Sequence, residues 1–256
     1  MSDLCELSAV NARQLIGAGE LSPLALLEAC IDRIEAINEA INAIVAKDYD
    51  RAIHEATEAA KAVKERRDLP PLHGIPIGIK DLNATEGLRT TWGSLLFKDH
   101  IPEADEALVA RLRRAGAIIV GKTNTPEFGS GTATNNLVYG PTHNPFDLER
   151  TSGGSSGGSG AALATGMLPL CQGGDTGGSL RNPATWCGVV GFRSTPGLVP
   201  RENRTLNYTH FNVQGPMARS VADIALMMTG CIGDDNHDPL AGPCDPLSFL
   251  NLEAAD

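Results

Sequence analysis

The sequence predicts an α/β fold in which a mixed, largely parallel sheet is flanked by helices. Segments with helical spacing of apolar residues alternate with short apolar runs, and one run, 117–121 (AIIVG), is apolar throughout. Such a run is typical of a strand that is covered on both faces of a parallel sheet. Alternation of this kind favours strands and helices that share one core.

Turn residues and apolar spacing set the order of the elements. Ser22 and Pro23 are typical of a helix start, and apolar residues follow them at three- and four-residue steps. One later helix is expected to expose Arg111, Arg113 and Arg114 along its rim. The predicted elements are a helix from Ser22–Pro23, a short strand at 41–45, a helix at 49–67, a buried strand at 75–82, a helix at 105–115 and the strand at 117–121.

Composition excludes several functional classes. The chain of 256 residues carries 31 acidic and 21 basic residues, so its formal charge of -10 opposes binding to a phosphate backbone and predicts no nucleic-acid partner. Its six cysteines form no C-x-x-C pair, which argues against a disulfide framework or a metal site. The N-terminus shows no secretory signal, so we expect a cytoplasmic protein. The apolar run 161–171 is too short to cross a membrane.

The glycines are unevenly distributed. Of 28 glycines, 12 lie between residues 151 and 191, which indicates that the backbone there must approach another group closely. A flexible linker is one interpretation, although the glycines continue into ordered-looking sequence. A phosphate-binding loop would need a lysine that the segment lacks. A nucleophile elbow at 153–157 (GGSSG) is a further alternative, but it leaves the second Gly-Gly-Ser at 177–179 unexplained.

A serine hydroxyl is a weak nucleophile unless a neighbouring base accepts its proton. A lysine can be that base when burial keeps its amine neutral near pH 7. Lys80 is the only lysine in an otherwise apolar predicted strand, so it is a candidate for this role. The alternative is a solvated edge residue or an ion-pair partner of Asp81.

Long motifs in this sequence resemble the amidase signature family of serine hydrolases. Coverage extends from about Leu7 to the C-terminus. The motifs are HGIPIGIKDL (73–82), GAIIVGKTNTPEFG (116–129), YGPTHNPFDLERTSGGSSGG (139–158), GGSSGGSGAALATG (153–166), GGDTGGSLRNPATWCGVVGFRSTPG (173–197) and QGPMARSVADIALMM (214–228).

The resemblance implies a Lys-Ser-Ser relay. It makes Ser179 the acyl-accepting nucleophile, Ser155 the bridging serine after an unusual cis peptide bond, and Lys80 the base. Ser156 is a rival for the bridging role, and the sequence leaves that choice open. Asp175 and Arg181 are expected to form an ion pair that supports the loop around Ser179.

The resemblance also assigns the substrate contacts. Backbone N–H groups of Thr176, Gly177, Gly178 and Ser179 are expected to stabilise the oxyanion, so we expect Gly177 and Gly178 to be intolerant of a Cβ atom. Gly129 is expected near the substrate pocket. Leu180 and Asn182 depart from the usual pattern at positions expected to lie away from the chemistry.

By resemblance the chain is an amidohydrolase that cleaves a small-molecule amide without a metal or organic cofactor. The alternatives are an amidotransferase A-type subunit that acts with partner subunits and an inactive, truncated remnant. A homo-oligomer is compatible with the sequence, and no membrane partner is expected. Family members are considerably longer, so the C-terminal part of the fold is expected to be missing. We expect one domain over 1–256, with N-terminal helices at 1–70, a catalytic core at 71–230 and an incomplete part at 231–256.

Overall fold

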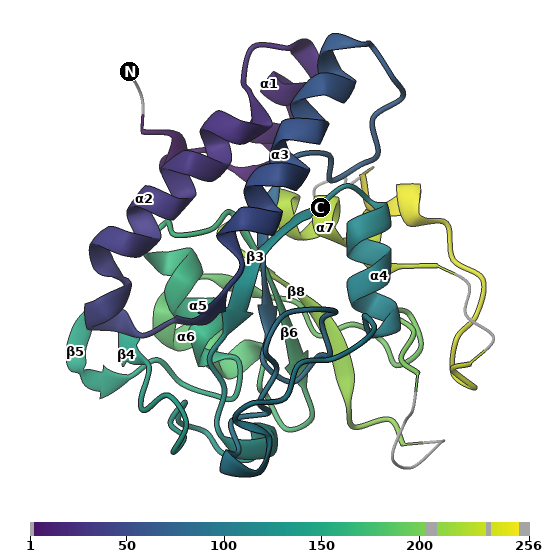
Figure 1. Ribbon diagram of the computed structural model, residues 1–256. Coiled ribbons are helices and arrows are strands. Elements are labelled where there is room, and N and C mark those ends of the chain that lie inside the picture. The colour runs from purple at the N-terminus through teal and green to yellow at the C-terminus, as the bar shows by residue number, and fades with distance from the viewer. Residues whose placement is uncertain (1–2, 203–208, 234–236, 251–256) are drawn as a thin grey trace, which may run out of the picture.

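A computed structural model describes residues 3–202, 209–233 and 237–250. A six-stranded mixed sheet in the order β1-β3-β2-β6-β8-β7 forms its centre (Figure 1). The central strands β3, β2 and β6 are parallel, whereas β1, β8 and β7 pair with their neighbours in antiparallel fashion. The strands are β1 (Ile44–Lys47), β2 (Pro76–Lys80), β3 (Ile118–Thr123), β6 (Leu170–Asp175), β7 (Val190–Gly191) and β8 (Val213–Ala218), and β4 (His143–Asn144) and β5 (Asp147–Thr151) form a separate hairpin.

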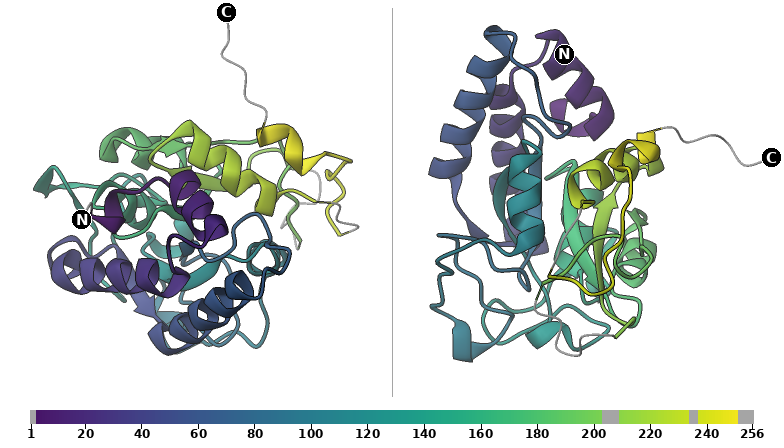
Figure 2. Two further views of the ribbon diagram at one scale, coloured as in Figure 1. Left: turned by 90° about the horizontal axis from the view of Figure 1, so that it is seen from above. Right: turned by 90° about the vertical axis from the view of Figure 1, so that its right-hand side faces the viewer.

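Helices flank this sheet, which confirms the predicted α/β class. Both views in Figure 2 place α2 and α3 together on one side of the molecule and α7 with η4 on the other. The α-helices are α1 (Ala9–Ala18), α2 (Pro23–Ile41), α3 (Tyr49–Lys64), α4 (Ala107–Arg114), α5 (Gly157–Ala164), α6 (Arg181–Cys187) and α7 (Val221–Cys231), and the 3-10 helices are η1 (Leu4–Glu6), η2 (Leu95–Phe97), η3 (Glu127–Gly129) and η4 (Pro246–Leu250).

Strands β2 and β3 are buried along their whole length. Their isoleucines and valine explain most of this burial, since each fully buried aliphatic side chain stabilises the fold by about 1.5–3 kcal/mol. Both strands nevertheless carry a lysine, and Lys80 and Lys122 are among the most completely buried side chains of the described residues. Burying two amines is costly, so each must have a specific environment.

The glycine-rich segment is a packed element and not a linker. Helix α5 is buried along seven of its eight residues and contacts β2, β3, β6 and β8. A Cβ atom on Gly158 would lie 2.2 Å from the backbone nitrogen of Asn124, and one on Gly154 would lie 3.0 Å from the carbonyl carbon of Thr132. The predicted close approach of backbone to backbone is therefore present, and it fixes α5 and the residues before it against the sheet.

Three sequence-based predictions need correction. The strand expected at 41–45 begins at Ile44, because α2 continues to Ile41 and Asn42 ends it in the left-handed conformation. The helix expected to reach residue 67 ends at Lys64. Of the three arginines expected on an exposed rim, Arg114 is exposed, whereas Arg111 and Arg113 are half-buried. The guanidinium of Arg113 forms ion pairs with Glu55 and Asp105, both at 2.8 Å. Among the described helices, none combines the length and the apolar character that a membrane span requires.

Candidate active site

Lys80 ends β2 and lies inside the protein. Its side chain is almost completely buried, and its Nζ atom lies 2.7 Å from Ser155 Oγ. Burial lowers the pKa of Lys80 to about 7, and this effect outweighs the carboxylate of Asp175, which raises it. A lysine with a pKa lowered this far has a neutral amine available near pH 7, so it can accept a proton from a hydroxyl.

Ser155 stands directly before α5, next to a cis peptide bond between Gly154 and Ser155. The N–H of Gly154 donates to Asn182 Oδ1 at 3.2 Å, which anchors the preceding peptide, between Gly153 and Gly154, to α6. Ser156 points elsewhere, because its hydroxyl lies 3.3 Å from both the N–H and the carbonyl oxygen of Gly174. Ser155, and not its rival Ser156, is therefore the serine that contacts Lys80.

Asp175 organises the loop that carries Ser179. It ends β6, and its buried carboxylate accepts hydrogen bonds from the N–H groups of Gly178 at 2.8 Å and Leu180 at 3.2 Å. Arg181 and Arg193 form ion pairs with the same carboxylate at 3.0 and 2.9 Å. Burial raises the pKa of Asp175, but Arg181 and the two N–H groups outweigh burial and lower the pKa to about 2. The carboxylate is thus charged at neutral pH and holds the loop around itself.

This loop brings Ser179 beside the Ser155 segment. The carbonyl oxygen of Ser179 accepts a hydrogen bond from Ser156 N–H at 3.3 Å. Ser179 itself is partly exposed, and its hydroxyl has no hydrogen-bond partner within the described parts of the chain. The residue is therefore partly accessible from outside, and its hydroxyl is not held by a structural contact within the described residues.

The predicted oxyanion donors require one correction. The N–H of Gly178 donates to Asp175 and is therefore engaged in holding the loop. In the portion of the protein that the structure describes, the N–H groups of Thr176, Gly177 and Ser179 have no protein acceptor. A substrate oxyanion needs donors of this kind, so three of the four predicted groups stay candidates.

The two loop glycines differ in what they tolerate. A Cβ atom on Gly177 would meet nothing within 4 Å, whereas Gly178 has a φ of +119°, a conformation that side chains rarely adopt. The folded protein therefore has room for a Cβ atom at Gly177, while its effect on an oxyanion stays a prediction. We predict that Gly178→Ala lowers the free energy of unfolding by about 1–2 kcal/mol, while Gly177→Ala changes it by less than about 0.5 kcal/mol. Urea denaturation of both variants measures this difference, and equal losses would contradict it.

Gly129 lies beside the Lys80–Ser155 pair. A Cβ atom on Gly129 would be 2.7 Å from Leu82 Cδ1 and 3.5 Å from Ser155 Oγ. Gly129 therefore lies close to Ser155, and a side chain at this position would meet Leu82; its place in a substrate pocket stays a prediction.

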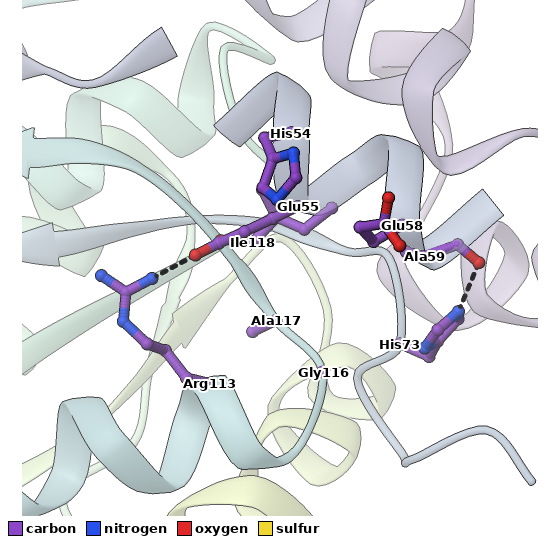
Figure 3. Close-up of a pocket in the computed structure, with 9 residues that line it drawn as sticks. All are labelled: His54, Glu55, Glu58, Ala59, His73, Arg113, Gly116, Ala117 and Ile118. Carbon is purple, nitrogen blue, oxygen red and sulfur yellow. Dashed lines mark hydrogen bonds and ion pairs between the residues drawn. The ribbon is translucent and has the colours of Figure 1, made fainter. Parts of the chain in front are cut away.

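A separate pocket lies against α3 and the start of β3 (Figure 3). Ile118 opens β3 at this pocket, whereas Thr123, which pairs with Lys80, closes the strand roughly 16 Å away. The polar lining is engaged internally, since Arg113 pairs with Glu55 and His73 Nε2 lies 3.0 Å from the carbonyl oxygen of Ala59. This pocket is therefore distinct from the candidate active site. Its lining residues are His54, Glu55, Glu58, Ala59, His73, Arg113, Gly116, Ala117 and Ile118.

Two residues of the site were not assigned a role from the sequence. Asn182 was expected to lie away from the chemistry, yet it holds the Gly154 peptide. Arg193 lies within the quoted GFRSTPG motif, and it donates to the carbonyl oxygen of Asp175 at 2.6 Å in addition to its ion pair. Arg193 is the one charged residue in GFRSTPG, and this isolated charge could have indicated a role for it in the site. No sequence pattern indicates the contact that Asn182 makes.

Comparison with known proteins identifies the family of this chain. The family model described as Amidase matches residues 25–253. The Acylamidase of Rhodococcus erythropolis is 44% identical over 98% of this chain and 52% of that protein. The A-type subunit of the Glutamyl-tRNA(Gln) amidotransferase of Roseiflexus castenholzii is 42% identical over 100% of this chain and 51% of that protein. The chain thus spans about half the length of these relatives.

Solved structures agree. A bacterial aryl acylamidase of the amidase signature family superimposes with a TM-score of 0.88 at 33% identity, covering 93% of this chain and 50% of that one. The peptide amidase from Stenotrophomonas maltophilia superimposes with a TM-score of 0.85 at 35% identity, covering 92% of this chain and 50% of that one. Sequence, fold and the family model therefore agree, and this chain belongs to the amidase signature family of hydrolases.

Proposed function

We propose that this protein hydrolyses the C–N bond of a small-molecule amide through an acyl-enzyme on Ser179. The observation that supports this most strongly is the buried contact between Lys80 Nζ and Ser155 Oγ, because it joins a base with a pKa of about 7 to a hydroxyl next to the Ser179 loop. The chemistry uses only side chains and backbone groups of the chain, and the proposal includes no metal or organic cofactor.

The proposed reaction has two halves. Ser179 Oγ attacks the carbonyl carbon while its proton passes to Ser155, whose own proton passes to Lys80. Negative charge on the carbonyl oxygen is stabilised by the N–H groups of Thr176, Gly177 and Ser179. The relay then returns the proton to the leaving nitrogen as the C–N bond breaks. Water next attacks the carbonyl carbon of the Ser179 ester and loses a proton to the same relay. The relay passes this proton to Ser179 Oγ as the ester C–O bond breaks and the carboxylic acid is released.

A fluorophosphonate probe tests the nucleophile directly, because it labels serines that are activated for attack. We expect labelling of Ser179 by peptide mass spectrometry and ammonia release from a panel of primary amides. Absence of both would contradict the proposed hydrolase and would favour the inactive-remnant alternative.

The pH dependence tests the base. Because only the neutral amine of Lys80 accepts a proton, and its pKa is about 7, the labelling rate should fall about tenfold per pH unit below pH 7 and level off above it. Lys80→Ala should lose both the rate and this dependence. Lys122→Ala is the matched control, since Lys122 is equally buried but contacts Thr85 and Asn83. Equal effects of the two variants would exclude Lys80 as the base.

A second candidate is ammonia transfer by an amidotransferase A-type subunit. Its support is the 42% identity to the A-type subunit of a Glutamyl-tRNA(Gln) amidotransferase over the whole of this chain. The acyl chemistry on Ser179 would be the same, but activity would require partner subunits. Co-purification of partners together with glutaminase activity only in their presence would favour this candidate over a stand-alone amidase.

A further inference from the structure

A row of aromatic rings lies beside the candidate active site. Trp92 stacks on His100 with ring centroids 5.1 Å apart and meets Phe97 edge-on at 4.8 Å. Phe97 in turn meets Phe128 edge-on at 6.2 Å. These separations and angles are those of favourable aromatic pairs. We call these four residues the aromatic row.

The aromatic row is attached to the catalytic residues by short backbone connections. Phe128 immediately precedes Gly129, whose Cβ position would lie 3.5 Å from Ser155 Oγ. Trp92 Nε1 donates to the carbonyl oxygen of Leu82 at 3.1 Å, and Leu82 is the second residue after Lys80. The N–H of Phe128 donates to the carbonyl oxygen of Trp92 at 2.7 Å, which joins the two ends of the row. The row is therefore fixed relative to the Lys80–Ser155 pair.

Both ends of this connection have unusual backbone conformations. Trp92 and Phe128 each have a φ of +51°, in the left-handed region that bulky residues avoid. Such strain is concentrated at ligand-binding and catalytic sites, where the surrounding structure maintains it.

The rings at the Gly129 end of the row are accessible. Phe128 is 55% exposed and Phe97 is 37% exposed. Phe97 and Phe128 carry no polar side-chain atom, so the surface that the row exposes at this end is flat and apolar. A flat aromatic group can extend a series of edge-on rings, whereas a small aliphatic group gains only a fraction of this contact.

We propose that the aromatic row binds the aryl group of an aromatic amide and thereby selects aryl over small aliphatic amides at Ser179. That the bound aromatic amide is a substrate rests on the proposed amidase function. Its binding can be measured without turnover. Phe97 and Phe128 are specificity-determining residues in this proposal.

Trp92 fluorescence measures the binding. The chain has two tryptophans, so Trp186→Phe leaves Trp92 as the only indole. In that protein we expect benzamide to quench Trp92 emission saturably, and acetamide to bind at least about tenfold more weakly. Phe128→Leu and, separately, Phe97→Leu should each weaken benzamide binding about 3- to 10-fold. Phe146→Leu is the matched control, because Phe146 is 74% exposed on the β4–β5 hairpin outside the row, and it should leave the affinity unchanged.

The outcomes separate the two proposals. Equal binding of benzamide and acetamide, or unchanged benzamide affinity in both phenylalanine variants, would overturn the role of the aromatic row, even where Ser179 is labelled by the fluorophosphonate. Emission that changes with protein concentration and not with benzamide would assign the row to a contact between two copies of the chain and would also overturn it. Selective binding of benzamide without labelling of Ser179 would support the aryl site and contradict the hydrolase.

Discussion

Ser179→Ala is expected to lower amide hydrolysis by at least about 10³-fold while leaving the fold intact. The loss follows from the proposed role of Ser179 as the nucleophile, since removal of a catalytic serine typically eliminates the covalent route. The fold should be unaffected because the Ser179 hydroxyl has no hydrogen-bond partner in the described residues. We therefore expect the free energy of unfolding to change by less than about 0.5 kcal/mol.

The neighbouring serines provide the comparison. Ser155→Ala should also abolish activity, because it removes the hydroxyl that contacts Lys80. Ser156→Ala should retain fluorophosphonate labelling and instead lose about 1 kcal/mol of stability, since its hydroxyl forms hydrogen bonds with the Gly174 backbone. Ammonia release, probe labelling and urea denaturation of the three variants measure these effects. An active Ser179→Ala protein, or an inactive Ser156→Ala protein with normal stability, would contradict the proposed relay.

Local sequence patterns predicted the parts of the fold that depend on local chemistry. The apolar runs that became β2 and β3 are recognisable because burial on both faces requires apolar residues at successive positions. Dense glycine indicated close backbone contact because only glycine permits it, and Gly158 shows that contact. The resemblance to a family then gave Lys80, Ser155 and Ser179 their expected roles, which the proximity of Lys80 to Ser155 supports.

Features that depend on contacts between distant segments were not predictable from the sequence. Asn182 holds the Gly154 peptide across 28 residues, and its side chain has no local pattern that indicates this contact. The aromatic row depends on the hydrogen bond from the N–H of Phe128 to the carbonyl oxygen of Trp92. The strained backbone conformations of these two residues follow from tertiary packing and not from local preference. The N–H of Gly178 was expected to donate to the oxyanion. It donates to Asp175 instead, because the buried carboxylate lies within hydrogen-bond distance, and the sequence does not indicate that position.

Lys80→Met should stabilise the protein while it abolishes activity. Burial lowers the pKa of Lys80 from 10.5 to about 7, so the folded state disfavours the charged amine that the unfolded chain carries. At about 1.4 kcal/mol per pH unit, this amounts to a few kcal/mol at neutral pH, from which the lost bond to Ser155 subtracts about 1 kcal/mol. We expect the free energy of unfolding to rise by about 2–4 kcal/mol at pH 6, measured by urea denaturation.

The sign of the pH dependence distinguishes this effect from improved packing. Because the pKa in the folded state lies below that in the unfolded state, the cost is complete below about pH 7 and vanishes as the pH rises toward 10.5. The advantage of the methionine variant should therefore shrink to about 1 kcal/mol or less at pH 9.5. An advantage that is independent of pH would instead indicate a packing effect and would contradict a lowered Lys80 pKa.

Lys122→Met is the matched control and should gain less stability. Burial lowers the pKa of Lys122 only to about 8, because the carboxylates of Asp81 and Glu106 raise it, so burying its charge costs less than burying that of Lys80. Lys122 Nζ also donates to the carbonyl oxygen of Asn83 and to Thr85 Oγ1, and the methionine loses both hydrogen bonds, at about 1 kcal/mol each. We expect the free energy of unfolding to rise by about 2 kcal/mol less for Lys122→Met than for Lys80→Met at pH 6. An equal gain in both variants would indicate that the apolar side chain, and not the pKa of each lysine, sets the effect.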